Sequence, residues 1–344
     1  MSGTSLDGLD IALCEFDFVE PFYNYEIKKA VTIKYSSYWK NALSNVKTAS
    51  AESYFALNAE FGRFIAAEIN NFLKNIKEAP RAIASHGHTI FHQPNLGFST
   101  QLGCGATIAA LTSITTVCDF RSLDVANGGQ GAPLVPIGDK LLFGKQEACL
   151  NIGGIANISF DDKKGNRIAY DICEANMLLN YLAEKVGRDY DEGGELAKDG
   201  NINTELLKEL NSQNYYSQTG AKSIGREWFD QSILPLVEKS KIEINDLLAT
   251  STEHIAQIIA NDLADKKNVL VTGGGTFNSF LIEKIKSKTP CEIIIPDAEP
   301  INFKEALIFA FLGYLRLNEK TNTLSSVTGA KSDSIGGAVY LSHL

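Results

Sequence analysis

The chain has 344 residues, of which 44% are hydrophobic, and its formal net charge is −9. The negative charge argues against a nucleic-acid-binding protein, because the phosphate backbone requires a basic surface. The length favours two domains over a single core, and no apolar run is long enough to span a bilayer, so we expect no membrane partner. The six scattered cysteines form no CxxC pair, which is typical of a reduced, cytoplasmic protein.

The first half of the chain alternates strand-like and helix-like segments. Two strand-like segments are followed by a long amphipathic helix whose apolar residues recur at helical spacing. The expected strands are 9–16, 25–34, 82–85 and 114–118, and the expected helices are 52–77 and 105–112. A loop rich in glycine and proline ends this half, and we place a domain boundary at Pro136, between lobes 1–136 and 137–344.

The second half repeats the order of hairpin strands, helix and strand. The expected strands are 148–152, 155–160, 167–171, 268–272 and 292–295, and the expected helices are 174–186, 228–239, 246–265, 278–286, 302–317 and 333–344. Because this unit occurs in both halves, we expect an α/β fold of two lobes with a cleft between them. We expect the last helix to pack back on the N-terminal lobe.

A glycine-rich turn stands near the start of each half. The backbone N–H groups of such a turn form a concavity that binds anions, so two of them suggest a polyphosphate ligand. The turn residues are Gly3, Thr4, Ser5, Asp7 and Gly8 in the first half and Gly153, Gly154 and Asn157 in the second. We expect Asp7 to contact a hydrated Mg²⁺ through water, because this ion takes oxygen ligands. An ordinary Asp-Gly β-turn is the alternative.

A third glycine cluster consists of Gly273, Gly274 and Gly275, between an apolar strand and a helix. Glycines allow a ligand to approach the backbone closely. We therefore expect adenosine to pack on this turn, with Asn278 as a polar contact. The alternative is a strained connection between strand and helix, which needs fewer than three glycines.

Two polar stretches are candidates for catalysis and substrate binding. Asp171 follows the strand-like residues 167–170 and precedes a helix, where a phosphoryl-transfer enzyme can place the carboxylate that deprotonates the attacking oxygen. A helix N-cap is the alternative for this residue. Arg121 lies between Asp119 and Asp124, and its guanidinium offers a fork for an acidic group of a substrate. A salt-bridged loop between domains is the alternative there.

Three histidines lie close together in the sequence, at His86, His88 and His92. A metallohydrolase site would need further ligands, but the other histidines, His254 and His343, stand on a helix and beside the C-terminus. We therefore favour a polar substrate pocket lined by His86, His88 and Thr89 over a metal site.

Six motifs along the chain together resemble one family. They read MSGTSLDGLD, SHGHTIFHQP, CDFRSLDVANGGQGAPLVP, LNIGGIAN, TGGGTFN and NTLSSVTGAKSDSIGGAVY. The chain resembles the anhydro-N-acetylmuramic acid kinases of the actin/hexokinase-like ATPase superfamily over nearly its whole length. The resemblance implies a two-lobed, ribonuclease H-like fold and a cytoplasmic enzyme of peptidoglycan recycling. A homodimer is one assembly open to the chain, and the sequence does not decide its oligomeric state. The implied reaction converts 1,6-anhydro-N-acetylmuramic acid, ATP and water to N-acetylmuramic acid 6-phosphate and ADP, with Mg²⁺.

The resemblance also implies roles for individual residues. Asp171 matches the base that activates the water. The first two glycine turns match the phosphate-binding turns, and the third matches the adenosine turn. The residues that match the sugar-binding positions are Thr89, Asp119, Arg121 and Glu305, with Arg121 near the developing charge.

Two regions depart from the family pattern. The family reads Asp-Thr-Gly-Pro-Gly-Asn where residues 171–176 read Asp-Ile-Cys-Glu-Ala-Asn, so the turn residues in the middle are lost. The family also has a short apolar strand before the first glycine turn, whereas that turn directly follows Met1 here. We expect this sheet position to stay unfilled and the turn to be tethered by the strand 9–16 alone. An ATP-regulated binding protein and an inactive pseudokinase of the same superfamily are the alternative functions.

Overall fold

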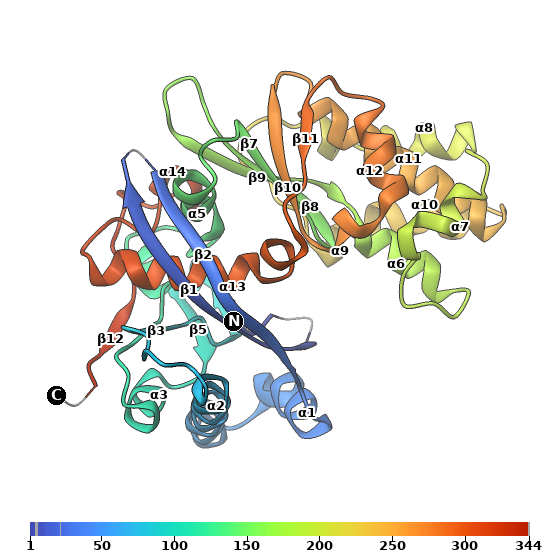
Figure 1. The fold of residues 1–344 in the computed structure, drawn as a ribbon. Coiled ribbons are helices and arrows are strands. Elements are labelled where there is room, and N and C mark those ends of the chain that lie inside the picture. The colour runs from blue at the N-terminus through green and yellow to red at the C-terminus, as the bar shows by residue number, and fades with distance from the viewer. Residues whose placement is uncertain (4–5, 21, 343–344) are drawn as a thin grey trace. The chain divides into compact units, whose positions relative to one another are not determined.

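The computed structural model describes residues 1–3, 6–20 and 22–342, which form two compact units. Unit 1 comprises Met1–Leu142 and Phe303–Leu344, and unit 2 comprises Phe143–Asn302. Both units mix helices and strands, as the sequence pattern predicts (Figure 1). The chain leaves unit 1 after α5 (Val135–Leu142), six residues beyond the boundary expected at Pro136, because α5 packs against a strand of unit 1.

Unit 2 contains one continuous five-stranded sheet. Its order is β11 (Glu292–Ile294), β10 (Asn268–Thr272), β7 (Ala148–Ile152), β8 (Ile155–Asp161) and β9 (Arg167–Glu174). β10 runs parallel to β7 and β11, whereas β8 runs antiparallel to β7 and β9. The carboxyl ends of β7, β9 and β10 therefore lie at the same edge of the sheet, which is where ligand sites of α/β sheets gather.

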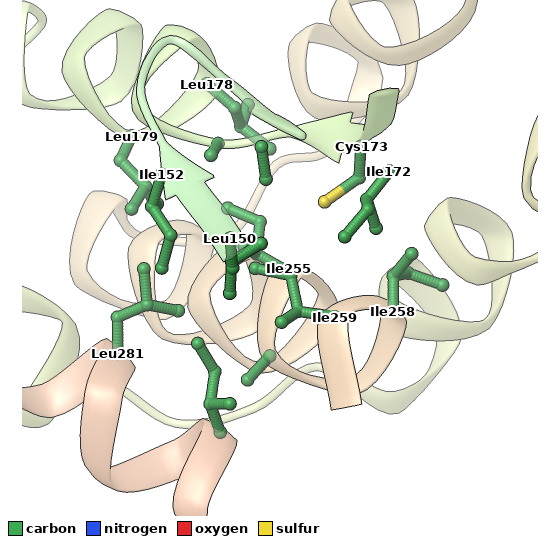
Figure 2. Close-up of a cluster of buried hydrophobic side chains, with 14 of the residues drawn as sticks. Leu150, Ile152, Ile172, Cys173, Leu178, Leu179, Ile255, Ile258, Ile259 and Leu281 are labelled. Atoms are coloured by element: carbon green, nitrogen blue, oxygen red, sulfur yellow. The ribbon is translucent and has the colours of Figure 1, made fainter. Parts of the chain in front are cut away.

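The core of unit 2 packs this sheet against helices. Figure 2 shows Leu150 of β7 beside Ile255 of α11 (Ile244–Asp262), and Ile152 and Ile259 belong to the same buried cluster. The apolar residues of α11 recur three and four positions apart, which places them on one helical face. The helices of unit 2 are α6 (Asn176–Glu184), α7 (Glu195–Lys198), α8 (Thr204–Asn211), α9 (Arg226–Trp228), α10 (Leu234–Lys239), α11 (Ile244–Asp262) and α12 (Ser279–Lys286).

The strands of unit 1 form three separate groups among the described residues. These are β1 (Gly8–Val19) with β2 (Phe22–Lys34), β4 (His88–Gln93) with β5 (Phe98–Leu102), and β12 (Ala338–Tyr340) with β6 (Thr116–Cys118) and β3 (Ile83–Ser85). An isolated bridge at Ser2 joins the first two groups, because Ser2 pairs antiparallel with Leu9 and parallel with His88. The remaining helices are α1 (Ser37–Asn45), α2 (Ala51–Leu73), α3 (Gly105–Thr112), α4 (Ser122–Ala126), α13 (Ala298–Leu317) and α14 (Ser325–Thr328).

The expected helix 333–344 is wrong. Within the described part of this segment the chain forms β12, which pairs antiparallel with β6. Two glycines precede the strand, and Gly337 has a φ of +116°, which is incompatible with a helix. A Cβ on Gly336 would lie 2.9 Å from the carbonyl oxygen of Phe120, so the close approach of this segment to Phe120 requires glycine.

A cavity of about 230 Å³ lies inside unit 1, between β1 and β3. Apolar residues of α2, including Ile65 and Ile69, and of α13, including Phe309, also line it. Among the described strands, β1 pairs only with β2 and β3 only with β6, so the strand edges on the other side carry no partner strand. Met1 lines the cavity too. The described chain thus leaves a cavity beside these two strand edges. The expectation that the glycine turn is tethered by the strand 9–16 alone is wrong, because Ser2 pairs with His88 of β4 as well as with Leu9 of β1.

Candidate functional site

The second glycine turn connects β7 to β8 and lies on the start of α6. The Gly153 carbonyl accepts a hydrogen bond from the Asn176 N–H at 3.1 Å, and the Gly154 carbonyl accepts from the Met177 N–H at 3.0 Å. These bonds fix the turn to the helix. A Cβ on Gly154 would meet nothing closer than Met177 Cβ at 4.0 Å, so the space beside this glycine is open. The turn is rigid and has room for a ligand group.

The third glycine cluster adjoins the second turn. Gly273 has a φ of +88°, and a Cβ there would lie 2.6 Å from the Ile152 carbonyl oxygen. Gly275 packs equally closely on the Ile152 side chain, whereas a Cβ on Gly274 would meet only the Asn176 amide nitrogen at 4.0 Å. Two of the three glycines are therefore required by the packing of β10 on β7, and Gly274 is the one that faces free space.

Asn278 caps the helix that follows this cluster. Its side-chain oxygen accepts a hydrogen bond from the Leu281 N–H at 3.0 Å, and the side chain is buried. Capping of this kind satisfies an N–H group that has no partner within the helix. The contact with adenosine expected of Asn278 stays a prediction.

Asp171 lies within β9, not at its end. The strand was expected to stop at residue 171, but it continues to Glu174, and α6 begins at Asn176. The turn residues of the family pattern, glycine and proline, are absent here, and this explains the longer strand. In their place the buried Ile172 and Cys173 extend β9. Asp171 is therefore no helix N-cap. It lies opposite Asn157 of β8, which brings a predicted phosphate-binding residue beside the predicted base.

The Asp171 carboxylate is held by two hydrogen bonds. Its Oδ2 accepts from the Ser223 hydroxyl at 2.8 Å and from the Ile224 N–H at 3.0 Å. Partial burial raises the pKa of Asp171 above its ordinary value, and these two donors act in the opposite direction. A carboxyl with a raised pKa is better suited to accept a proton at neutral pH. Sequence reasoning missed Ser223, which is 52 residues from Asp171 and has no distinguishing motif.

The altered residues after Asp171 form a buried polar network. Glu174 is fully buried, and its carboxylate accepts a hydrogen bond from the Tyr216 hydroxyl at 2.7 Å. The His254 Nε2 lies 3.1 Å from the other carboxylate oxygen, and its Nδ1 contacts the side chain of Asn211. A buried carboxylate is tolerated only when it is paired in this way. The network replaces the lost turn residues with contacts that fix the end of β9.

The first glycine turn lies in unit 1. Thr4 and Ser5 lie outside the described residues, whereas Gly3, Asp7 and Gly8 are described. A Cβ on Gly8 would lie 2.5 Å from the Ile33 carbonyl oxygen, so glycine is required where β1 begins beside β2. The Asp7 side chain is exposed, which leaves its carboxylate accessible to a hydrated cation.

Arg121 is the most extensively bonded of the predicted sugar-binding residues. Its Nε and Nη2 lie 3.2 and 2.9 Å from His86 Nε2, and its Nη1 donates to the Gly131 carbonyl at 2.6 Å. Burial lowers the pKa of Arg121 to about 10, and the negative charge of Glu305 opposes this effect. Desolvation raises the pKa of the Glu305 carboxyl, and Arg121 again opposes the change. The structure thus brings Arg121 and Glu305 within electrostatic range.

The other predicted residues of unit 1 have local partners. Asp119 accepts a hydrogen bond from the Ser122 hydroxyl at 2.6 Å and shapes the turn before α4. Thr89 lies on β4 opposite Gln101. The three histidines contact different partners: His86 contacts Arg121, His88 contacts Ser2 and His92 contacts Ser99. No group of three metal-binding side chains occurs in the part of the chain that the structure describes. The expected pocket of His86, His88 and Thr89 stays a prediction.

Among the described residues, no helix is long and apolar enough to cross a membrane. Possible homodimer formation stays a prediction.

Comparison with known proteins identifies the family. The model of the family described as anhydro-N-acetylmuramic acid kinase matches residues 1–342. The relative named anhydro-N-acetylmuramic acid kinase in Pasteurella multocida is 37% identical, with 99% of this chain and 95% of that protein covered. The Francisella tularensis subsp. novicida protein of the same name is 37% identical, with 98% and 97% covered. Hexokinase from Schistosoma mansoni complexed with glucose is similar at a TM-score of 0.32 and 10% identity, with 89% of this chain and 83% of that chain covered. The matches over the whole length show that this chain belongs to the anhydro-N-acetylmuramic acid kinase family.

Proposed function

We propose that the chain phosphorylates 1,6-anhydro-N-acetylmuramic acid with ATP while water opens the anhydro bridge. The products are N-acetylmuramic acid 6-phosphate and ADP, and the process belongs to cytoplasmic peptidoglycan recycling. The names of the relatives support the substrate. The observation that carries the proposal is the convergence in unit 2 of two glycine turns and a hydrogen-bonded carboxylate, Asp171.

Unit 2 is the proposed ATP-binding unit. The open spaces beside Gly154 and Gly274 allow phosphate and nucleoside groups to approach the backbone. In unit 1 the first glycine turn is proposed to contribute further phosphate contacts, through Gly3, Thr4, Ser5 and Gly8. Mg²⁺ fits the chain through the exposed Asp7 carboxylate, and when bound it neutralises the charge of the phosphates.

Asp171 is the proposed general base. It takes a proton from water as the water oxygen forms a bond to C1 of the sugar. The bond between C1 and O6 breaks, and O6 forms a bond to the γ-phosphorus of ATP as the bond from that phosphorus to ADP breaks. The free Oδ1 of Asp171 suits this role, since the described residues donate hydrogen bonds only to Oδ2.

Unit 1 is the proposed sugar-binding unit, through Thr89, Asp119, Arg121 and Glu305. An arginine has five N–H donors. His86 and Gly131 accept hydrogen bonds from three of the Arg121 nitrogens, so two N–H groups have no protein acceptor among the described residues and are available for oxygen atoms of the sugar. Because its pKa remains far above neutral, Arg121 carries its positive charge and can stabilise negative charge that develops during the transfer.

The proposal is tested by measuring ADP release with 1,6-anhydro-N-acetylmuramic acid as the only acceptor. We expect ADP and a phosphorylated reducing sugar in equal amounts, and no ADP release with N-acetylmuramic acid, which lacks the anhydro bridge. ATP binding without any turnover would favour the inactive pseudokinase, for which the altered residues 172–175 are the motivating observation. Sugar-dependent changes in nucleotide affinity without transfer would instead favour an ATP-regulated binding protein.

A further inference from the structure

Residues 215–224, which we call the clasp, close over the edge strand that carries Asp171. Among the strands that the structure describes, β9 is the last of the sheet, so one of its edges has no neighbouring strand. The Asp171 N–H donates to the Lys222 carbonyl at 3.1 Å, and the Tyr215 hydroxyl donates to the Asp171 carbonyl at 2.6 Å. The clasp therefore supplies the backbone partners that a further strand would supply, and it fixes the backbone of Asp171.

The clasp also distinguishes the two oxygens of the Asp171 carboxylate. The Ser223 hydroxyl and the Ile224 N–H both donate to Oδ2, at 2.8 and 3.0 Å. Among the described residues no hydrogen bond is donated to Oδ1. Donors of this kind hold negative charge at the oxygen that they contact and fix the rotation of the carboxylate. Oδ1 is left as the atom that can accept a proton.

We propose that Ser223 is a positioning residue that orients the Asp171 carboxylate, so that Oδ1 receives the proton from the attacking water. The inference rests on the proposed role of Asp171 as the general base. Ser223 touches neither the water nor the sugar in this account, and it acts only through Asp171. The Ile224 N–H shares the task, but a side-chain substitution leaves this backbone donor in place.

The titratable side chains around Asp171 include Tyr215, Lys222 and Asp262, whose Oδ1 accepts a hydrogen bond from the Tyr170 hydroxyl at 3.4 Å. Tyr215 lies within electrostatic range, and burial together with Asp171 raises its pKa, so it stays neutral. Lys222 holds its ammonium over the rings of Tyr170 and Tyr215, at 5.4 and 4.8 Å from their centroids. On the neighbouring strand the residue opposite Asp171 is the neutral Asn157. Ser223 and Ile224 are thus the groups that lower the pKa of Asp171 against the effect of burial.

The test compares Ser223→Ala with Ser223→Thr, which keeps a hydroxyl. The pKa of Asp171 is measured by ¹³C NMR of the labelled carboxyl, assigned by its loss in Asp171→Asn, and kcat/KM is measured against pH. We expect Ser223→Ala to raise this pKa by about half a pH unit to one pH unit, because one stabilising donor is lost. The acidic limb of the kcat/KM profile should move to higher pH by the same amount. Ser223→Thr should leave the pKa of Asp171 and the acidic limb of the profile as they are in the unsubstituted protein.

Ser212→Ala is the matched control, because the exposed Ser212 hydroxyl donates to the Glu209 carbonyl, away from Asp171. It should leave the pKa and the profile unchanged. An unchanged pKa and profile in Ser223→Ala would overturn the role of Ser223 while leaving Asp171 as the base. A lower kcat at every pH with no movement of the profile would show a merely structural role and would also overturn the inference. Normal turnover by Asp171→Asn would overturn the proposed base, and with it the role of Ser223.

Discussion

The two units hold their glycine turns in different ways. In unit 2 the turn joins two adjacent strands of a continuous five-stranded sheet and is hydrogen-bonded to the start of α6. In unit 1 the strands form separate groups, and a cavity of about 230 Å³ lies beside β1, the strand that follows the turn. On the other side of that turn, Ser2 pairs with Leu9 and His88, and Met1 is hydrogen-bonded to Asp10.

The glycines of these turns serve two distinct purposes: some allow close packing of the backbone, and others leave space for a ligand. In unit 2 the closely packed glycines, such as Gly273, build the sheet edge, while Gly154 and Gly274 leave space for a ligand. In unit 1 Gly8 is closely packed where β1 begins. Beside β1 and β3, apolar side chains face the cavity with no further strand of the described chain packed against them. We therefore expect unit 2 to dominate catalysis and nucleotide binding, and unit 1 to respond more to added structure.

The largest expected effect is that of Asp171→Asn in unit 2. The amide is close in shape to the carboxylate and keeps an oxygen that can accept hydrogen bonds from the clasp, but it cannot take a proton. We expect a folded protein that binds both substrates, with kcat lower by about 10²–10⁴-fold, which is the usual contribution of a general base. Steady-state kinetics measure kcat and KM, and thermal unfolding shows whether the variant is folded. Normal turnover would show that Asp171 is not the general base. Asp119 of unit 1 would then be the next candidate, and unit 1 instead of unit 2 would dominate catalysis.

Gly154→Val tests the ligand space of unit 2. The valine side chain would enter the open space beside the turn without a backbone clash, so the fold should persist. We expect ATP to bind at least about 10-fold more weakly, a loss of roughly 1.4 kcal/mol, because the side chain occupies the space needed by a phosphate group. Calorimetric titration measures the affinity, and Gly154→Ala should give a smaller loss. Unchanged affinity in a folded Gly154→Val protein would argue against this phosphate site.

Gly273→Ala and Gly274→Ala distinguish packing from binding within one cluster. Gly273 combines a positive φ with close contact to Ile152, so alanine should lower the free energy of unfolding by about 1–3 kcal/mol. Alanine at Gly274 faces free space and should change it by less than about 0.5 kcal/mol. Urea unfolding measures the free energy of unfolding of both variants. Equal effects at the two positions would contradict the distinction between structural and ligand-facing glycines.

The smallest expected effect concerns the cavity of unit 1. We expect an apolar extension of about eight residues before Met1, a common strand length, to fill the space beside β1 and β3. The added strand would bury apolar surface beside the glycine turn, so the melting temperature should rise by a few degrees and ATP should bind more tightly. A glycine-serine extension of equal length is the control. Identical melting and ATP binding in the two extended proteins would show that this sheet position needs no strand.

The sequence predicted the elements whose signals are local. The strands that form β7, β8 and β10 and the helix α2 are confirmed, because periodicity and flanking turns mark them. The helix expected at 333–344 is wrong, because pairing with β6, more than 200 residues earlier in the chain, determines the structure of this segment. Contacts between residues distant in sequence were equally inaccessible. The bonds from Ser223 to Asp171 and from Arg121 to His86 follow from tertiary packing, which no spacing in the sequence encodes.

The most direct test of the proposed reaction is turnover of 1,6-anhydro-N-acetylmuramic acid and ATP in H₂¹⁸O, with the product mass read within the first minutes. A parallel sample of unlabelled product in H₂¹⁸O corrects for exchange at C1. We predict one ¹⁸O in the sugar, at C1, and none in the transferred phosphate, because water attacks carbon and O6 attacks phosphorus. Label in inorganic phosphate, with no labelled sugar phosphate, would show simple ATP hydrolysis and contradict the account.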